Sequence, residues 1–132
     1  MENKQMLKTE KPKTDNFGRF RFNQWGVCTN PERIAQGLRR NYDNAVELAG
    51  NAAGWTFGLE MYSDNLDDGS CSPCSMQQRT YATRHDALRA AIMAMRAYYA
   101  GVLPCHRYTN LRRFIRELEE RFWNERQLSL FD

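Results

Sequence analysis

The 132-residue chain lacks several features that assign proteins to common classes. No stretch approaches the roughly 18 consecutive apolar residues of a membrane helix. Residues 1–13 are charged and contain no apolar core of a secretory signal. We therefore expect a cytoplasmic protein without a membrane partner, whose four cysteines are thiols. No internal repeat is visible either, so one domain is expected from this length.

Motifs that carry catalysis are also missing. The chain has no Gly-x-Ser-x-Gly elbow, no Gly-Lys-Ser/Thr phosphate loop and no paired-acid motif. Of its two histidines, His85 is expected in the first turn of a helix, and His106 follows Pro-Cys in a loop. We therefore do not expect an enzyme.

Lysine is absent after Lys13, so every later basic residue is arginine. Arginine favours bidentate contacts with phosphate or carboxylate groups over diffuse attraction. The formal net charge of +3 is too small for a histone-like polycation, and the ten arginines of residues 76–132 stand against six acids. Residues 1–15 are rich in lysine and lack periodicity, so they are expected to be a flexible basic arm.

Hydrophobic periodicity predicts a single α+β domain over residues 16–126. Alternating side chains predict strands at 17–25 and 55–63, with a returning strand at 76–82 after a polar loop. Helical spacing predicts helices at 30–49, 83–101 and 109–126. Both faces of the strand at 55–63 look usable, which indicates a central position. We expect a small antiparallel sheet of two to four strands packed against about three helices.

Candidate helix caps accompany these helices. Asn30 followed by Pro31 is typical of a helix start. The stretch from Thr83 to Asp86 has the spacing of a capping box, with Asp in place of Glu. Thr109 or Asn110 is expected to cap the last helix.

Arginines supply the candidate nucleic-acid contacts. The set on and before the last helix is Arg107, Arg112, Arg113 and Arg116. A second pair, Arg19 and Arg21, alternates with Phe20 and Phe22, a pattern that suits base stacking beside phosphate contacts. The alternatives are a solvated helix face interspersed with Glu, and an ordinary strand with Phe inward and Arg outward.

Cysteine spacing raises a second possibility, a zinc site. Cys71 and Cys74 have the CxxC spacing of a metal knuckle, and Cys105 with His106 would complete four ligands. No second CxxC follows, and the chain has enough apolar residues to build a core unaided, so we expect no cofactor. The alternative is a Ser/Pro loop that happens to carry two thiols.

The last residues form a distinct segment, 127–132. The sequence Gln127-Leu128-Ser129-Leu130-Phe131 places three apolar side chains after the predicted end of the last helix. A soluble domain gains nothing from exposing them, so something is expected to cover them. One amide and three apolar anchors suit an extended peptide bound in a partner's pocket. The alternative is that the tail pairs with the edge of the domain's own sheet.

This pentapeptide resembles the motif by which bacterial polymerases and repair proteins bind the sliding clamp of DNA replication, the polymerase III β subunit. The resemblance implies that Gln127 hydrogen-bonds at the rim of the clamp's pocket and that Leu130 and Phe131 fill its apolar cleft. Leu128 matches the motif's first Leu, and Ser129 matches the small polar spacer. The implied partner is the sliding clamp, with DNA as a possible second contact.

Simple energetics limit the peptide's affinity. Burying each of its three apolar side chains contributes about 1.5–3 kcal/mol, while ordering five residues costs about 1–2 kcal/mol apiece. Weak binding by the peptide alone therefore calls for a second contact, to DNA or to the clamp face. The sequence predicts an accessory or regulatory protein of the clamp. The other hypotheses are a nucleic-acid-binding module whose tail completes its own fold, and a zinc-supported interaction domain.

Overall fold

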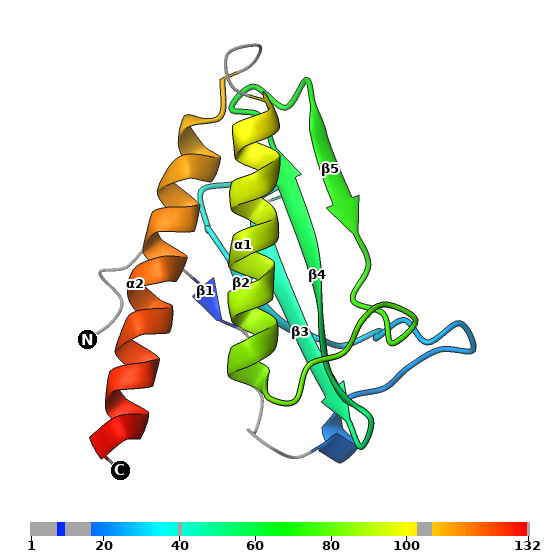
Figure 1. Cartoon of the computed structure of the whole chain (residues 1–132). Helices are drawn as coiled ribbons and strands as arrows, with labels where there is room; N and C mark the ends of the chain where they lie inside the picture. The colour runs from blue at the N-terminus through cyan, green and yellow to red at the C-terminus, as the bar shows by residue number, and fades with distance from the viewer. Residues whose placement is uncertain (1–7, 10–16, 40, 103–106, 132) are drawn as a thin grey trace.

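The structure is a computed structural model that describes residues 8–9, 17–39, 41–102 and 107–131. Of residues 8–9, 17 and 123–131 it describes the backbone alone. The chain passes first through an antiparallel sheet and then through two long helices (Figure 1). This arrangement confirms the predicted α+β class.

The sheet is a meander in which each strand pairs with the next one along the chain. Its strands are β1 (Lys8–Thr9), β2 (Glu32–Ala35), β3 (Ala45–Asn51), β4 (Gly54–Tyr62) and β5 (Gly69–Ser72). The short β1 adds one edge to a body of four strands, β2 to β5. The predicted strand at 55–63 corresponds to β4, which lies between β3 and β5 as its two usable faces indicated.

Two helices, α1 (Arg84–Val102) and α2 (Thr109–Phe131), lie side by side against one face of the sheet (Figure 1). About three helices had been expected. The Thr83 hydroxyl accepts a hydrogen bond from the Asp86 N–H at 3.0 Å, so the predicted capping residue of α1 is confirmed. The bounds of α2 run past the predicted end near Arg126.

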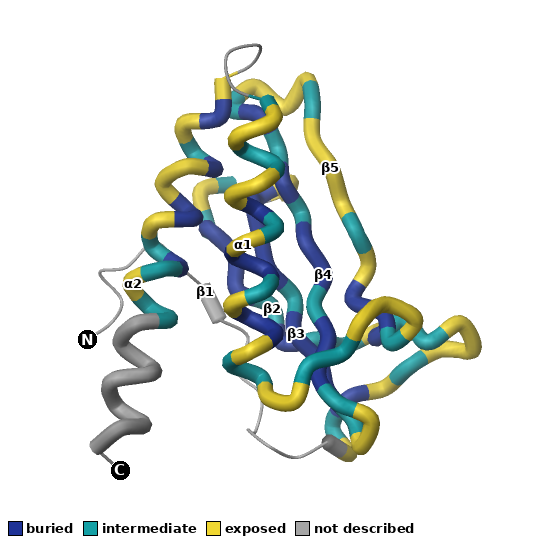
Figure 2. The backbone as a smooth tube through the Cα atoms, in the orientation of Figure 1, coloured by how far each residue is buried: buried dark blue, intermediate teal, exposed yellow. Residues whose placement is uncertain are grey.

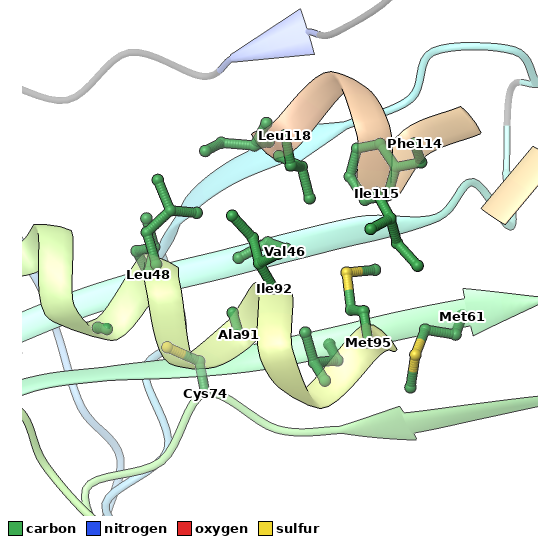
Figure 3. Packing of buried hydrophobic residues seen from close by; sticks show 14 of the residues in the cluster. Val46, Leu48, Met61, Cys74, Ala91, Ile92, Met95, Phe114, Ile115 and Leu118 are labelled. Atoms are coloured by element: carbon green, nitrogen blue, oxygen red, sulfur yellow. The ribbon is translucent and has the colours of Figure 1, made fainter. Parts of the chain in front are cut away.

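Apolar side chains from the helices and the sheet form the core (Figure 3). Met95 of α1 and Phe114 and Leu118 of α2 are fully buried, as are Val46 and Leu48 of β3. Figure 2 shows buried positions along β3 and β4 and exposed positions along the outer sides of both helices. Since burying each such side chain contributes about 1.5–3 kcal/mol, this layer is the main source of stability.

A second, thinner layer covers one end of the opposite face of the sheet. Thr56 and Gly58 alternate with core residues of β4, so they point away from the helices. The Thr56 hydroxyl donates to the Ser75 carbonyl at 3.0 Å, and the Cys28 N–H donates to the Cys74 carbonyl at 2.8 Å. The segment 20–30 and residues 72–75 therefore close this end, while the end near Glu60 stays open.

The N-terminus of α2 is capped by a distant residue, Asp64, which lies in the loop between β4 and β5. Its two carboxylate oxygens accept the N–H groups of Thr109 at 3.1 Å and Asn110 at 2.9 Å. The sequence had predicted Thr109 or Asn110 itself as the cap. A carboxylate at this position satisfies two unpaired donors and complements the positive end of the helix dipole. Asp68 of the same loop accepts a hydrogen bond from the Tyr108 hydroxyl at 2.9 Å.

The predicted helix at 30–49 is wrong, because this segment forms β2, a loop and β3. Gly37 and Tyr42 adopt left-handed backbone with φ of 77° and 63°, which interrupts any helix between them. The buried Asp43 carboxylate fixes the loop by accepting the N–H groups of Leu38 at 3.1 Å and Arg39 at 2.9 Å. The local helix preference of the β3 residues is overridden by their pairing with β4.

Two predicted strands are also wrong. Residues 17–25 contain a 3-10 helix, η2 (Phe17–Arg19), and a single bridge from Phe22 to Cys28. Residues 76–82 contribute only a bridge between Tyr81 and Trp55. The strand that returns beside β4 is β5, inside the predicted polar loop. Its sequence, Gly-Ser-Cys-Ser, has no alternating apolar residues to reveal it, because its side chains lie at an exposed edge.

Candidate functional site

An open, arginine-lined groove with a volume of about 320 Å³ runs between the outer sides of α1 and α2. The residues that line this arginine groove are Arg96, Tyr99, Ala100, Arg112, Ile115, Arg116 and Glu119. The two helices position these side chains because Leu88, Ala91 and Met95 of α1 turn inward, which leaves the neighbouring positions at the surface.

Electrostatics in the arginine groove favour an anionic ligand. Arg96 donates from Nη1 to Glu119 Oε2 at 2.8 Å, across the two helices. Among the described residues, no carboxylate forms an ion pair with Arg112 or Arg116, whose side chains are exposed. Three guanidinium groups and one carboxylate thus meet in the groove, beside the ring of Tyr99. This set can hold a phosphate backbone and offer one aromatic surface to a base.

The predicted arginine set on α2 is only partly brought together. Arg112 and Arg116 are one turn apart and share the groove. Arg113 is exposed on an adjacent face, where its charge opposes the rise that burial causes in the pKa of Glu117. Arg107 precedes α2, and its carbonyl accepts the Asp64 N–H at 3.0 Å. Arg96 and Tyr99 were missed by sequence reasoning, since their relation to α2 depends on how the helices pack.

The structure does not join Arg19 and Arg21 to this groove. They lie in the segment that begins with η2, at the other end of the sheet from the first turn of α2 (Figure 1). Arg19 donates to the Asn30 carbonyl at 3.1 Å and lies over the Phe20 ring. Phe20 is buried edge-on against Trp55, with ring centroids 5.8 Å apart. Phe20 therefore belongs to the core and Arg21 is exposed, but the segment is not the strand that both interpretations assumed. The nucleic-acid role of Arg19 and Arg21 remains a prediction.

A larger cavity, of about 810 Å³, lies on the open end of the sheet's other face. Arg33 and Glu60 form an ion pair there at 3.0 Å, and both side chains remain about one-third exposed. The rings of Tyr42 and Tyr62 meet edge-to-face at 5.8 Å. Burial, followed by the hydrogen bond with Cys71, raises the pKa of Tyr62 above its usual value. This mixture of paired charges and phenols is polar and does not favour one class of ligand.

The predicted zinc ligands lie only partly within the described chain. Cys71 is exposed on β5, whereas Cys74 is buried, with its thiol directed to the Thr56 carbonyl at 3.8 Å. Cys105 and His106 lie outside the described residues. Within the described ranges, no group of three or more His, Cys, Asp or Glu side chains is placed to hold a metal ion. Zinc binding therefore remains an alternative hypothesis beside the expectation of no cofactor.

The predicted docking peptide also lies beyond the described side chains, which end at Phe122, and its backbone forms the last turns of α2 instead of the extended tail that was expected. The clamp contacts that the resemblance implies for Gln127, Leu128, Ser129, Leu130 and Phe131 therefore remain predictions. Comparisons with protein-family models, with curated proteins and with solved structures found no match to this chain. Among the described helices, none is long and apolar enough to cross a membrane.

Proposed function

We propose that this protein docks on the bacterial sliding clamp through residues 127–131 and acts there as an accessory or regulatory protein in replication or repair. The observation that carries the proposal is the match of all five residues to the clamp-binding motif. The arginine groove supports it, because α2 carries two of the groove's arginines and its sequence continues into the peptide. A phosphate contact near the clamp would supply the second interaction that a weak peptide needs.

Replacing Phe131 with Ala should weaken clamp binding by about 10- to 100-fold, because the buried phenyl ring contributes about 1.5–3 kcal/mol and each 1.4 kcal/mol is tenfold. Isothermal titration calorimetry of the full-length protein against a bacterial sliding clamp measures this change. Ser129→Ala is the matched control, since the spacer makes no anchoring contact in the motif. The affinity of this variant for the clamp should stay within about threefold of the wild-type affinity. A chain truncated after Arg126 that still binds the clamp as the full chain does would contradict the proposal.

A second candidate function is nucleic-acid binding by the domain itself, with the tail as part of its own fold. The arginine groove favours this candidate, because Arg112 and Arg116 are exposed and no described carboxylate pairs with them. The two candidates differ in what truncation does. Loss of residues 127–132 removes clamp binding in the first case, and it lowers the melting temperature while sparing nucleic-acid binding in the second.

The double variant Arg112→Gln/Arg116→Gln should raise the Kd for a single-stranded oligonucleotide roughly tenfold. The plot of log association constant against log salt concentration has a negative slope, and its magnitude should decrease by about 1.4, since each lost phosphate contact contributes about 0.7 on single strands. Fluorescence anisotropy over a series of salt concentrations measures both quantities. Arg89→Gln is the control, because Arg89 is an exposed arginine of α1 that does not line the groove. Diffuse attraction would give the same loss for each charge removed, so a loss in the Arg89 control of about half that of the double variant would contradict a groove site.

A further inference from the structure

Cys28 and Cys74 lie opposite each other where the segment 20–30 crosses the end of the sheet. The Cys28 N–H donates to the Cys74 carbonyl at 2.8 Å, and the Met76 N–H donates to the Gly26 carbonyl at 2.9 Å. Between these two bonds lies an antiparallel bridge from Val27 to Ser75. The next residues along such a ladder face each other, so Cys28 is the cross-strand partner of Cys74.

This placement satisfies the main requirement for a disulfide. Facing residues of an antiparallel pair have Cα atoms about 4.5–5.5 Å apart and direct their side chains to the same side. A disulfide needs a Cα separation of about 4.4–6.8 Å. Both cysteines belong to the same buried cluster, and the two residues are 5% and 1% exposed. To form the bond, each thiol has to turn from its present acceptor, which is Asn30 Oδ1 at 3.5 Å for Cys28 and the Thr56 carbonyl at 3.8 Å for Cys74.

We propose that Cys28 and Cys74 are a disulfide-forming pair that a small organic disulfide, such as oxidised glutathione, converts from two thiols into one Sγ–Sγ bond. The Cys28 thiolate first attacks one sulfur of the oxidant, forms a mixed disulfide and releases one glutathione thiolate. The Cys74 thiolate then attacks the Cys28 sulfur and releases the second. The protein loses two electrons and two protons. The electrons reduce one oxidised glutathione to two thiolates, which take up two protons by way of the buffer and become thiols.

The surroundings of the pair determine how it reacts and what the bond does. Burial raises the pKa of both thiols, so the thiolate fraction is small and the exchange should be slow at neutral pH and faster at alkaline pH. The bond would fasten the segment that holds Phe20 against Trp55 to the chain that covers β4. Closing the long loop between residues 28 and 74 should raise the melting temperature by roughly 5–10 °C.

The test uses the full chain with Cys71→Ser and Cys105→Ser, which keeps only the proposed pair. The protein is incubated with oxidised glutathione at mildly alkaline pH. It is then unfolded in denaturant in the presence of an alkylating agent, which labels free thiols, and analysed by mass spectrometry. We expect a monomer without alkylation or bound glutathione and a linked peptide that joins residues 28 and 74. A thermal melt should show the rise in melting temperature, and a dithiol reductant should reverse it.

Three outcomes would overturn the inference: two alkylated thiols, a mixed disulfide that persists on either cysteine, or a disulfide-linked dimer. Circular dichroism first establishes that the double Ser variant folds. If it does not fold, peptide mapping of the oxidised wild-type protein decides between linkages. A bond between residues 28 and 74 supports the inference, and a bond between residues 71 and 74 overturns it.

Discussion

Replacing Arg84 with Ala should lower the free energy of unfolding by about 3 kcal/mol. Arg84, the first residue of α1, forms a bidentate ion pair with Glu32 of β2, with Nε–Oε1 and Nη2–Oε2 distances of 2.8 and 2.6 Å. The Glu32 side chain is only 4% exposed, so removing the guanidinium leaves a buried carboxylate without its ion-pair partner. Breaking a buried pair costs about 3–5 kcal/mol. The lower end applies, because the Arg84 side chain is 26% exposed and water can partly replace it.

Urea denaturation followed by circular dichroism measures this loss, and two controls separate its causes. Arg89→Ala removes an exposed arginine from the same helix and should change stability by less than about 0.5 kcal/mol. Glu32→Gln combined with Arg84→Ala should recover part of the loss, because no buried charge then remains. If the double variant loses as much free energy of unfolding as the two single variants lose together, the unpaired buried carboxylate is not the cause.

The exposed pair on the open face gives a useful contrast. Arg33 and Glu60 form an ion pair at 3.0 Å, but their side chains are 30% and 27% exposed. Pairs of that kind contribute about 0–1 kcal/mol. Burial, more than distance, therefore explains why the Arg84–Glu32 pair matters to the fold. It joins the start of α1 to β2, the strand farthest from α1 in sequence within the main sheet.

The sequence predicts those elements whose signals are local. β4 alternates strictly, and α1 has both a cap at Thr83 and an apolar stripe that includes Leu88 and Met95, so both were placed correctly. β3 was mistaken for helix, because Ala, Glu and Leu favour helix locally and only its pairing with β4 makes it a strand. The cap of α2 was missed because Asp64 is remote in sequence from Thr109.

The same distinction applies to the arginine groove. Arg112 and Arg116 share a helix face by their spacing, so sequence alone could group them. Arg96 joins them only through its contact with Glu119 across the two helices. The hydrophobic periodicity of each helix does not predict how two packed helices are rotated relative to each other. Arg19 and Arg21 were included for their alternation with aromatics, yet the Phe20 ring is used by the core.

Gly58→Ala should destabilise the protein by about 2–3 kcal/mol, although Ala is ordinarily the better residue in a strand. A Cβ at this position would lie 2.6 Å from the Cys74 nitrogen, 2.8 Å from the Ser72 oxygen and 2.9 Å from the Pro73 carbonyl carbon. All three are backbone atoms, so no side chain can rotate away. Hydrogen bonds hold that backbone, including one from the Gln78 amide to the Pro73 carbonyl at 2.9 Å. Overpacking of this kind costs about 1–3 kcal/mol or more.

Gly101→Ala is the matched control, because a Cβ there meets nothing within 4 Å and the residue lies in the last turn of α1. Removing glycine from a helix gains up to about 1 kcal/mol, so this variant should be unchanged or slightly more stable. Opposite signs for the same substitution would establish that the clash with residues 72–74, and not the lost backbone freedom of glycine, sets the outcome. If Gly58→Ala melted at the wild-type temperature, the chain covering β4 would have to be free to move outward, and the facing arrangement of Cys28 and Cys74 would lose its support.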